Sequence, residues 1–152
     1  MTASDLRLDG LSVLILEDEY ILADDARRVL QRAGAKVLGP FGSALEALTA
    51  VERSKPDCAV LDLNLGTGPD FGPARALRAY GVPVVFFSGY DTAVIPADFR
   101  KAHFLQKPVH MAMIVDVVAA ICGRSAGGPT DSRARRGESL QLAITTDDGS
   151  PP

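Results

Sequence analysis

Apolar and polar positions alternate along this chain in blocks that predict five strands separated by helical segments. Five runs are almost wholly apolar, and each is too short for a helix but apolar enough for a buried strand. These runs cover residues 11–16, 36–39, 57–63, 82–87 and 103–106. Strands that are apolar on both sides are typical of a parallel sheet whose two faces are both covered.

Two helices are predicted in the first half of the chain. Apolar residues recur every three or four positions over residues 20–33, and Gly34 follows as a C-terminal stop. Further along, Ser43 stands as an N-cap with Glu46 three residues later, which is the spacing of a capping box. The positions expected to face the core are Leu22, Ala26, Val29 and Ala33 in the first helix, with Leu30 beside them, and Leu45, Leu48 and Val51 in the second.

Helical signals are uneven in the second half of the chain. Residues 70–80 are weakly helical, only a short helix around residues 97–101 fits before the fifth strand, and residues 109–122 form the last helix. The inward faces are expected to carry Phe71, Ala74 and Leu77, and then Met113, Val117 and Ile121. Strands that alternate with helices in this way indicate an α/β fold with a doubly wound parallel sheet.

The composition divides the chain into a packed domain and a polar tail. An apolar fraction of 47% in 152 residues suits one domain with a sizeable core. From about residue 123 the sequence is rich in Gly, Ser, Pro, Arg and Asp, and its one apolar patch is Leu140–Ile144. Such a segment buries too little surface to offset its ordering entropy. We therefore expect an N-terminal extension at residues 1–9, the domain at 10–122 and a disordered tail at 123–152.

Charge and cysteine content exclude several classes of protein. A net charge of −3 gives no support to a broad nucleic-acid footprint. Cys58 and Cys122 fit neither a metal-site spacing nor a disulfide framework, and Cys58 lies in an apolar run as a small core residue. The N-terminus lacks the apolar region of a signal peptide, and no apolar stretch approaches the roughly 20 residues needed to span a bilayer. We expect a reduced, cytoplasmic protein with no membrane or nucleic-acid partner.

Reactive side chains gather where the predicted strands end. Glu17 and Asp18 follow the first run, Asp62 ends the third, Ser88 ends the fourth and Lys107 ends the fifth. In an open parallel α/β sheet, ligands bind beyond the carboxyl ends of the strands. Three consecutive carboxylates at residues 17–19 would repel one another. This stretch is therefore either a solvated turn or a site for a cation.

The residues at these strand ends suit a magnesium ion and a phosphoryl group. Asp18 and Asp62 would supply carboxylate oxygens to Mg²⁺, and Glu17 would hold a metal-bound water or assist from further out. An aspartate beside Mg²⁺ can act as a nucleophile and form an aspartyl phosphate. The charge that develops on a transferring phosphoryl group needs hydrogen-bond donors, and Lys107 and the Ser88 hydroxyl are placed to provide them.

Four motifs, each at the end of a predicted strand, resemble those of the response-regulator receiver domains of two-component signalling. They are LILEDE, VLDLNLG, FFSGY and LQKP, in that order, and the resemblance covers about residues 10–122. It implies a flavodoxin-like sheet with strand order 2-1-3-4-5 and bound Mg²⁺. The roles it implies are phosphoacceptor for Asp62, metal site for Glu17, Asp18, Asp62 and the backbone carbonyl of Asn64, and phosphoryl binding for Ser88 and Lys107.

The stretch FFSGY is also similar to the signature of a receiver subgroup nicknamed FATGUY. In that subgroup an aromatic residue follows the hydroxyl-glycine pair and the fourth helix is shortened or disordered. This chain departs from the signature at Phe87, where the nickname has alanine, and it keeps Phe104 three residues before Lys107, where ordinary receivers carry a switch aromatic. Tyr90 and Phe104 are therefore both candidate switch residues. The resemblance also implies a cis bond before Pro108.

The resemblance implies a single-domain response regulator rather than an enzyme. A histidine kinase, of the HWE or related type for this subgroup, or a histidine phosphotransfer protein would donate a phosphoryl group to Asp62, and affinity for a downstream protein would change. One alternative is a Mg²⁺-dependent aspartyl phosphohydrolase, but such enzymes usually have a second acid two residues after the nucleophile, where this chain has Asn64. The other alternative is a receiver-like scaffold that is never phosphorylated, against which the intact acids argue.

Overall fold

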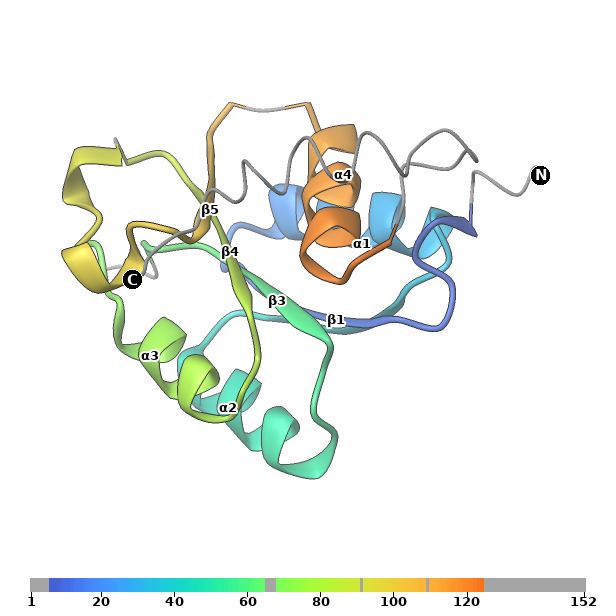
Figure 1. The fold of residues 1–152 in the computed structure, drawn as a ribbon, viewed down its shortest axis with the longest axis horizontal. Helices are drawn as coiled ribbons and strands as arrows, with labels where there is room; N and C mark the ends of the chain where they lie inside the picture. Colours follow the sequence, from blue (N-terminus) through green and yellow to red (C-terminus); the bar gives the residue numbers. More distant parts are fainter. Residues whose placement is uncertain (1–5, 65–67, 91, 109, 125–152) are drawn as a thin grey trace.

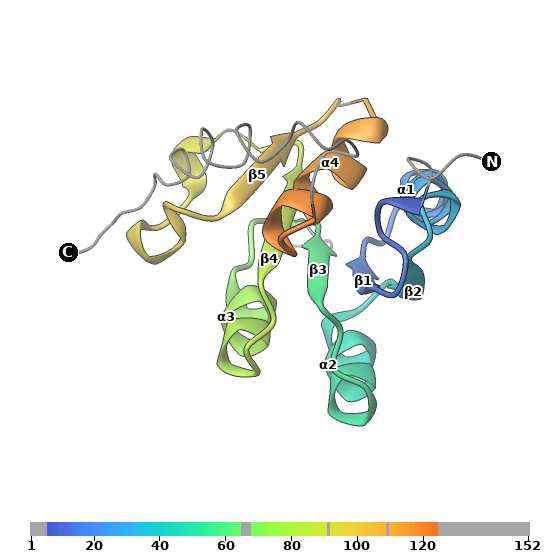
Figure 2. The same cartoon turned by 45° about the vertical axis from the view of Figure 1, so that its right-hand side comes forward.

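The five predicted strands form one parallel sheet in the computed structural model, which describes residues 6–64, 68–90, 92–108 and 110–124. The sheet order is β2-β1-β3-β4-β5, as the resemblance implied; Figure 1 labels four of these strands and Figure 2 labels all five. The strands are β1 (Ser12–Leu16), β2 (Lys36–Phe41), β3 (Cys58–Leu61), β4 (Val84–Ser88) and β5 (His103–Gln106). The reversal of strand order falls between β1 and β3, so the carboxyl ends of these two strands form the switch-point crevice of the fold.

Helices cover both faces of the sheet. They are α1 (Tyr20–Arg32), α2 (Ala44–Arg53), α3 (Gly72–Ala79) and α4 (Ala112–Ile121). Figure 2 shows α1 and α4 on one face and α2 and α3 on the other. Between β4 and β5 the described chain forms only two short 3₁₀ turns, η2 (Thr92–Val94) and η3 (Ala97–Phe99), which confirms the shortened helix at this place. Among the described residues, no helix combines the length and the apolar character that a membrane crossing requires.

Two hydrophobic cores lie on opposite faces of the sheet because strand side chains alternate. Val13 and Ile15 of β1 belong to the core under α1 and α4, whereas Leu14 and Leu16 belong to the core under α2 and α3. Cys58 is fully buried in the first core, as expected. Its hydrogen bond with the Cys122 side chain and its burial both raise the pKa of the Cys58 thiol. The near-continuous apolar runs of the strands are thus explained by burial on both faces.

The inward faces of three helices differ in part from the prediction. The buried residues are Ala23, Ala26 and Leu30 in α1, Ala47 and Val51 in α2, and Ile114, Val115, Val118 and Ala119 in α4. Leu45 and Met113 were expected to face inward, but they are 77% and 45% exposed. In α1 the predicted Ala26 and Leu30 are buried, and Ala23 is buried with them. In α2 the predicted Val51 is buried, but the small Ala47 faces the sheet in place of Leu45. In α4 apolar residues occur all around the helix, so the pattern does not specify one stripe.

Local signals at helix and strand ends were more reliable. The Ser43 hydroxyl accepts a hydrogen bond from the Glu46 N–H at 3.3 Å, which confirms the N-cap of α2. The Lys107–Pro108 peptide bond is cis, as the resemblance implied. Gly39 has a φ of +97°, and a Cβ there would lie 2.7 Å from the backbone nitrogen of Phe41, so this position requires glycine. The sequence had not indicated that β2 continues past Gly39 to Phe41.

Described residues before β1 contact the packed domain. Leu8 is fully buried in the first core, and its N–H donates to the carbonyl of Ala33 at 2.8 Å. Arg7 forms an ion pair with Asp116 of α4 at 2.7 Å. Arg7 and Leu8 therefore contact α4 and the end of α1, within the stretch for which an N-terminal extension was expected. The expected disordered tail lies outside the described residues beyond Arg124.

Candidate functional site

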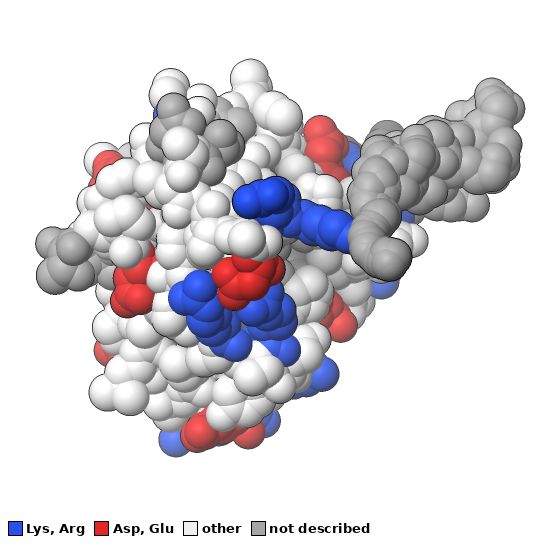
Figure 3. All heavy atoms as spheres, turned by 60° about the vertical axis from the view of Figure 1, so that its left-hand side comes forward, with Lys and Arg blue, Asp and Glu red and all other residues white. Residues whose placement is uncertain are grey.

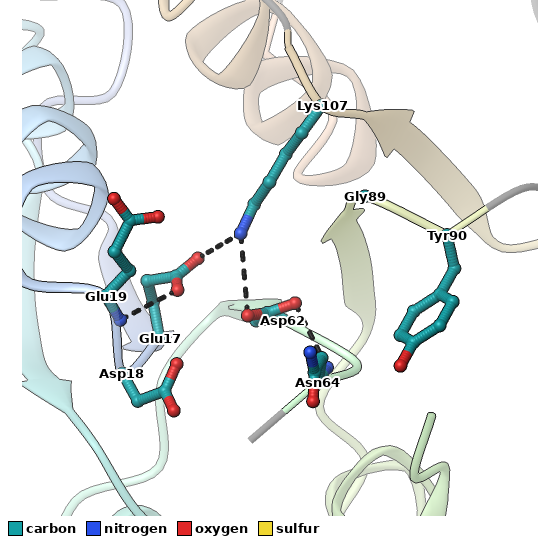
Figure 4. Close-up of a pocket in the computed structure, with 8 residues that line it drawn as sticks. All are labelled: Glu17, Asp18, Glu19, Asp62, Asn64, Gly89, Tyr90 and Lys107. Carbon is teal, nitrogen blue, oxygen red and sulfur yellow. Dashed lines mark hydrogen bonds and ion pairs between the residues drawn. The ribbon is translucent and has the colours of Figure 1, made fainter. Parts of the chain in front are cut away.

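A cavity of about 460 Å³ opens at the carboxyl edge of the sheet. The parallel register explains its position, because Leu16 at the end of β1 pairs with Leu61 at the end of β3. The next residues in the two strands, Glu17 and Asp62, therefore emerge side by side. Figure 4 shows the residues that line the cavity, which are Glu17, Asp18, Glu19, Asp62, Asn64, Gly89, Tyr90 and Lys107.

Glu17 is held firmly at the bottom of this cavity. The residue is only 5% exposed, and its backbone N–H donates to the carbonyl of Phe41 at 2.9 Å. Its Oε1 accepts a hydrogen bond from Lys107 Nζ at 2.9 Å, and its Oε2 accepts one from the Glu19 N–H at 3.0 Å. Burial raises the pKa of Glu17, and the hydrogen bond from Lys107 only partly opposes this effect.

Asp62 lies beside the same lysine. It is 8% exposed, and its N–H donates to the carbonyl of Leu16 at 2.8 Å, which continues the hydrogen bonding of β1 with β3. Its Oδ1 accepts a hydrogen bond from the Asn64 N–H at 3.1 Å, and its Oδ2 lies 3.5 Å from Lys107 Nζ. The Asp62 carboxylate is thus fixed in orientation, with Oδ2 directed toward the Lys107 ammonium group.

Lys107 connects the two buried acids. Its ammonium group contacts Glu17 and Asp62 and lies 5.0 Å from the centre of the Phe87 ring. Burial alone would lower the pKa of Lys107, but the hydrogen bond to Glu17 and the charges of Glu17 and Asp62 outweigh burial and raise it. Lys107 therefore carries its charge at neutral pH and offsets part of the repulsion between the carboxylates.

The acidic residues of this cavity fit a small, hard cation. One carboxylate oxygen each from Glu17, Asp18 and Asp62 can be chosen so that all three lie within 4.8 Å of one another. Oxygens around an octahedral Mg²⁺ are roughly 3 Å apart when adjacent and roughly 4 Å apart when opposite. Small side-chain movements would bring the three oxygens from their present spacing to the spacing around Mg²⁺, and Asp18 is exposed and has room to move. The ligand set consists of oxygen alone, as Mg²⁺ prefers.

Ser88 was expected at the site, but its hydroxyl is not among the groups that line the cavity. The residue is fully buried at the end of β4, and its Oγ accepts a hydrogen bond from the Tyr90 N–H at 3.0 Å. Its carbonyl accepts a hydrogen bond from the Lys107 N–H at 2.6 Å, which joins the ends of β4 and β5. The serine thus lies directly beside the site, with its side chain engaged by the following turn.

The two candidate switch aromatics have different environments. Tyr90 lines the cavity and is partly buried against the second core (Figure 4). Phe104 is half-buried in that core, with its ring centre 6.4 Å from that of Phe86. Phe104 does not line the cavity. Of the two residues, only Tyr90 is hydrogen bonded to a predicted phosphoryl-binding residue, through its N–H and Ser88.

Sequence reasoning missed two contributors to the site. Glu19 was given no role of its own within the acidic stretch 17–19, yet its backbone N–H orients the carboxylate of Glu17. Phe87 was noted only as a departure from a signature, yet its ring lies beneath the ammonium of Lys107. A hydrogen bond from a backbone N–H cannot be predicted from the residue type, because almost every residue carries this group. The ring could have been anticipated, because Phe87 stands next to Ser88 on a strand whose carboxyl end forms the site.

A five-stranded parallel sheet of this order, with an acidic cavity and a lysine at its carboxyl edge, defines the class of receiver-type α/β domains. The family model of the response regulator receiver domain matches residues 13–119, and the chain belongs to this family. Receiver domains belong to two-component systems, and the family acts generally as a phosphoacceptor switch rather than as a classical enzyme.

Two curated relatives are bacterial regulators. The chain is 32% identical over 80 residues to the transcriptional regulatory protein YvrH of Bacillus subtilis, an alignment that covers 53% of this chain and 34% of YvrH. It is 28% identical over 111 residues to the phyllosphere-induced regulator PhyR of Methylorubrum extorquens, which covers 70% of this chain and 42% of PhyR. The chain thus spans less than half the length of either relative.

Two solved structures of similar proteins match over nearly their whole length. A response regulator receiver protein from Sinorhizobium medicae is 26% identical with a TM-score of 0.63, and the match covers 76% of this chain and 97% of that one. The BeF₃-activated conformation of SdrG from Pseudomonas melonis is 31% identical with a TM-score of 0.57, and the match covers 78% and 98%. These matches agree with the strand order and the layers described above.

Proposed function

We propose that this chain is a single-domain response regulator that accepts a phosphoryl group on Asp62. The donor is a histidine kinase or a histidine phosphotransfer protein, and Mg²⁺ is required. The observation that carries the proposal is the position of Asp62, whose Oδ2 lies 3.5 Å from Lys107 Nζ in a cavity shared with Glu17 and Asp18. A phosphoacceptor needs an available carboxylate, a cation site and a fixed positive charge, and these groups supply all three.

The transfer is a substitution at phosphorus. A carboxylate oxygen of Asp62 forms the new P–O bond while the P–N bond of the donor phosphohistidine breaks, and the imidazole nitrogen keeps the electron pair and takes up a proton. When bound, Mg²⁺ would supply positive charge to the phosphoryl oxygens. Lys107 would move from Asp62 onto a phosphoryl oxygen while keeping its hydrogen bond with Glu17. The N–H of Asn64 would keep the acceptor carboxylate oriented.

The acids would divide the metal site between them. Asp18 and Asp62 would bind Mg²⁺ directly, together with the backbone carbonyl of Asn64. Both oxygens of Glu17 already accept hydrogen bonds, from Lys107 and from the Glu19 backbone, which favours a role for Glu17 through a metal-bound water. Glu17 would also keep Lys107 aimed at the phosphoryl group.

We infer that Tyr90, rather than Phe104, reports the phosphorylated state. The Ser88 hydroxyl would rotate to donate to the phosphoryl group, and its hydrogen bond from the Tyr90 N–H would be lost. The turn at residues 89–90 would then rearrange, and the phosphoryl group shifts this equilibrium only through contacts that are better in the rearranged state. The short turns η2 and η3 support membership of the FATGUY subgroup and, with it, a kinase of the HWE or related type.

We infer further that the protein acts in the cytoplasm on a downstream protein rather than on nucleic acid, in keeping with its net charge of −3. The alternative of an aspartyl phosphohydrolase is disfavoured because the second position after Asp62 is Asn64, which provides no acid for turnover. The alternative of a scaffold that never receives phosphate is disfavoured because Asp18, Asp62 and Lys107 are all in place at the cavity.

Intact-protein mass after incubation with acetyl phosphate tests the proposal. Wild type should gain a single phosphoryl adduct with Mg²⁺ and none without it, and Asp62→Asn should gain none. Asp25→Asn, which removes an exposed carboxylate of α1, serves as the matched control and should behave as wild type. Sustained release of phosphate from small phosphoesters would favour the hydrolase. No adduct on folded wild type, either from acetyl phosphate or from a phosphorylated HWE-type kinase, would favour the scaffold.

A further inference from the structure

A second cavity, which we name the β5 groove, lies far from the acidic site, where strands β4 and β5 begin. Its volume is about 270 Å³, and its floor is mainly apolar. The apolar residues that line it are Val82, Pro83, Val84, Phe99, Ala102 and Ile121. Val82 and Pro83 precede β4 and Val84 begins it, Phe99 ends η3, Ala102 precedes β5, and Ile121 ends α4. The apolar lining of the groove thus comes from three separate segments of the domain.

The groove lies at an edge of the sheet. Among the described strands, β5 has β4 as its one neighbour. An edge strand presents backbone donors and acceptors to any extended segment that approaches. Of the four crossovers, the described residues of the one between β4 and β5 form only the short turns η2 and η3 in place of a helix (Figure 2). This edge therefore has less cover than the strands beneath α2 and α3.

The rim of the groove is basic. Asp98 is paired with Arg75 at 3.2 Å and with Arg78 at 2.9 Å, and Figure 3 shows basic side chains on both sides of an acidic one on this face. The guanidinium of Arg78 also lies 4.2 Å from the centre of the Phe99 ring. Lys101 lines the groove as well and is exposed. Positive charges outnumber the one carboxylate at this rim, which suits a segment with an apolar centre and an acidic end.

The chain itself contains such a segment. In the sequence SLQLAITTDD, which begins at residue 139, Leu140, Leu142 and Ile144 alternate with Gln141, Ala143 and Thr145. A period of two places the three large apolar residues on one face of an extended segment. Asp147 and Asp148 follow at its end. This pattern matches an apolar floor with a basic rim.

The connection between the groove and the segment is long enough. The described chain ends at Arg124, three residues after Ile121, which lines the groove. Residues 125–139 then lead to Leu140, and about 15 residues at roughly 3.3 Å each reach about 50 Å. A domain of this size has a radius of gyration of only about 13 Å. A tether of this length also keeps the segment at an effective concentration of roughly millimolar order.

We propose that residues 140–144 of this chain dock in the β5 groove. Leu140, Leu142 and Ile144 rest on the apolar floor, and Asp147 and Asp148 lie against the basic rim. For these residues the proposal replaces the expectation of a disordered tail. The docked segment covers the β5 edge and excludes other extended segments from it. This inference does not depend on phosphorylation of Asp62, because the groove and the acidic cavity share no lining residue.

Nuclear magnetic resonance of the isotopically labelled full chain tests this docking. The amides of residues 140–144 should exchange at least about tenfold more slowly than in a random coil, and the methyl groups of Leu142 should show nuclear Overhauser contacts with the Phe99 ring. Leu142→Asp should abolish both effects. Ala143→Asp is the matched control, because it places the same charge one position along, on the opposite face. It should keep the contacts and stay within about twofold of the wild-type exchange rates.

Three results would overturn the proposal. Random-coil exchange at residues 140–144 of wild type would show that the segment does not dock. Equal loss of contacts in Leu142→Asp and Ala143→Asp would contradict the proposal that Leu140, Leu142 and Ile144 face the groove. Contacts seen only between differently labelled chains in a mixed sample would assign the groove to a second copy. Both substitutions lie outside the packed domain, so loss of folding cannot imitate any of these results.

Discussion

Removal of the Lys107 charge is the perturbation that most directly probes the electrostatics of the site. Lys107→Met keeps much of the aliphatic length but leaves the carboxylates of Glu17 and Asp62 buried without their cation. Breaking a fully buried ion pair costs about 3–5 kcal/mol. The Lys107 side chain is 18% exposed and borders an open cavity, so solvent screening reduces this figure. We expect about 2 kcal/mol of lost stability at neutral pH without divalent ions.

The destabilisation should depend on pH in a defined direction. Burial already raises the pKa of Glu17, and Lys107→Met removes the hydrogen bond that opposes this effect, so the pKa rises further. An acid whose pKa is raised in the folded state favours folding at low pH, and this contribution is lost as the pH rises through the folded pKa. The defect of Lys107→Met should therefore be largest at neutral pH and shrink as the pH falls toward the ordinary range of a glutamate.

Urea unfolding in the presence of a chelator, over a series of pH values, measures this defect. With a slope of about 1–3 kcal/mol per molar urea, a loss of about 2 kcal/mol moves the midpoint by roughly 1 M. Glu17→Gln in the Lys107→Met background should recover part of the loss, because it removes one of the uncompensated charges. Lys36→Met, at an exposed lysine of β2, is the control and should change little. A loss below about 0.5 kcal/mol, or no recovery by Glu17→Gln, would refute this reasoning.

Three further predictions concern the metal site, the aromatic cluster and the basic rim. Mg²⁺ at 100 times its dissociation constant should stabilise the fold by about 2.7 kcal/mol, and a thermal melt should show this gain abolished in Asp18→Asn but kept in Glu19→Gln. Phe99→Ala should cost about 3–5 kcal/mol in urea unfolding, because this ring is 3% exposed and packs against two other phenylalanines. Hydrogen bonds from two arginines of α3 lower the pKa of Asp98. Wild type should therefore be more stable than Asp98→Asn above the ordinary aspartate pKa, and this advantage should be lost as the pH falls through the lowered pKa, as urea unfolding over a pH series would show.

Each of these three predictions has a result that would contradict it. An equal gain from Mg²⁺ in Asp18→Asn and wild type would place the ion elsewhere. A cost below about 1 kcal/mol for Phe99→Ala would mean that the cluster contributes little to packing. A difference between wild type and Asp98→Asn that grows as the pH falls would reverse the sign assigned to the arginine contacts.

The sheet was predictable because two independent features of the sequence mark its strands. Their runs are apolar on both faces, and each reactive residue stands where a run ends. The strand order followed from the resemblance. Glu17 lies next to Asp62 because the residues that precede them, Leu16 and Leu61, pair in the parallel register of β1 and β3. The short segment between Ser88 and Lys107 left no room for a full helix, and the structure has two 3₁₀ turns there.

Helix faces and side-chain orientations were less predictable for physical reasons. Leu45 has a spacing suited to a core position but lies 77% exposed, because the small Ala47 faces the sheet instead. Ser88 stands at the predicted strand end, yet its hydroxyl is engaged by the N–H of Tyr90. The hydrogen bond from the Glu19 backbone to Glu17 depends on the path of the loop and not on the residue type. Such details arise from three-dimensional packing that a linear pattern does not contain.

Chemical trapping of the phosphorylated residue tests the central claim most directly. Full-length protein is incubated with acetyl phosphate and Mg²⁺ and then reduced with borohydride, which converts an aspartyl phosphate into homoserine, and the modified position is read by peptide mass spectrometry. The account predicts homoserine at Asp62 in wild type, and none when Mg²⁺ is chelated before the phosphodonor is added. Homoserine at another aspartate such as Asp18, or equal conversion of Asp62 with and without Mg²⁺, would contradict it.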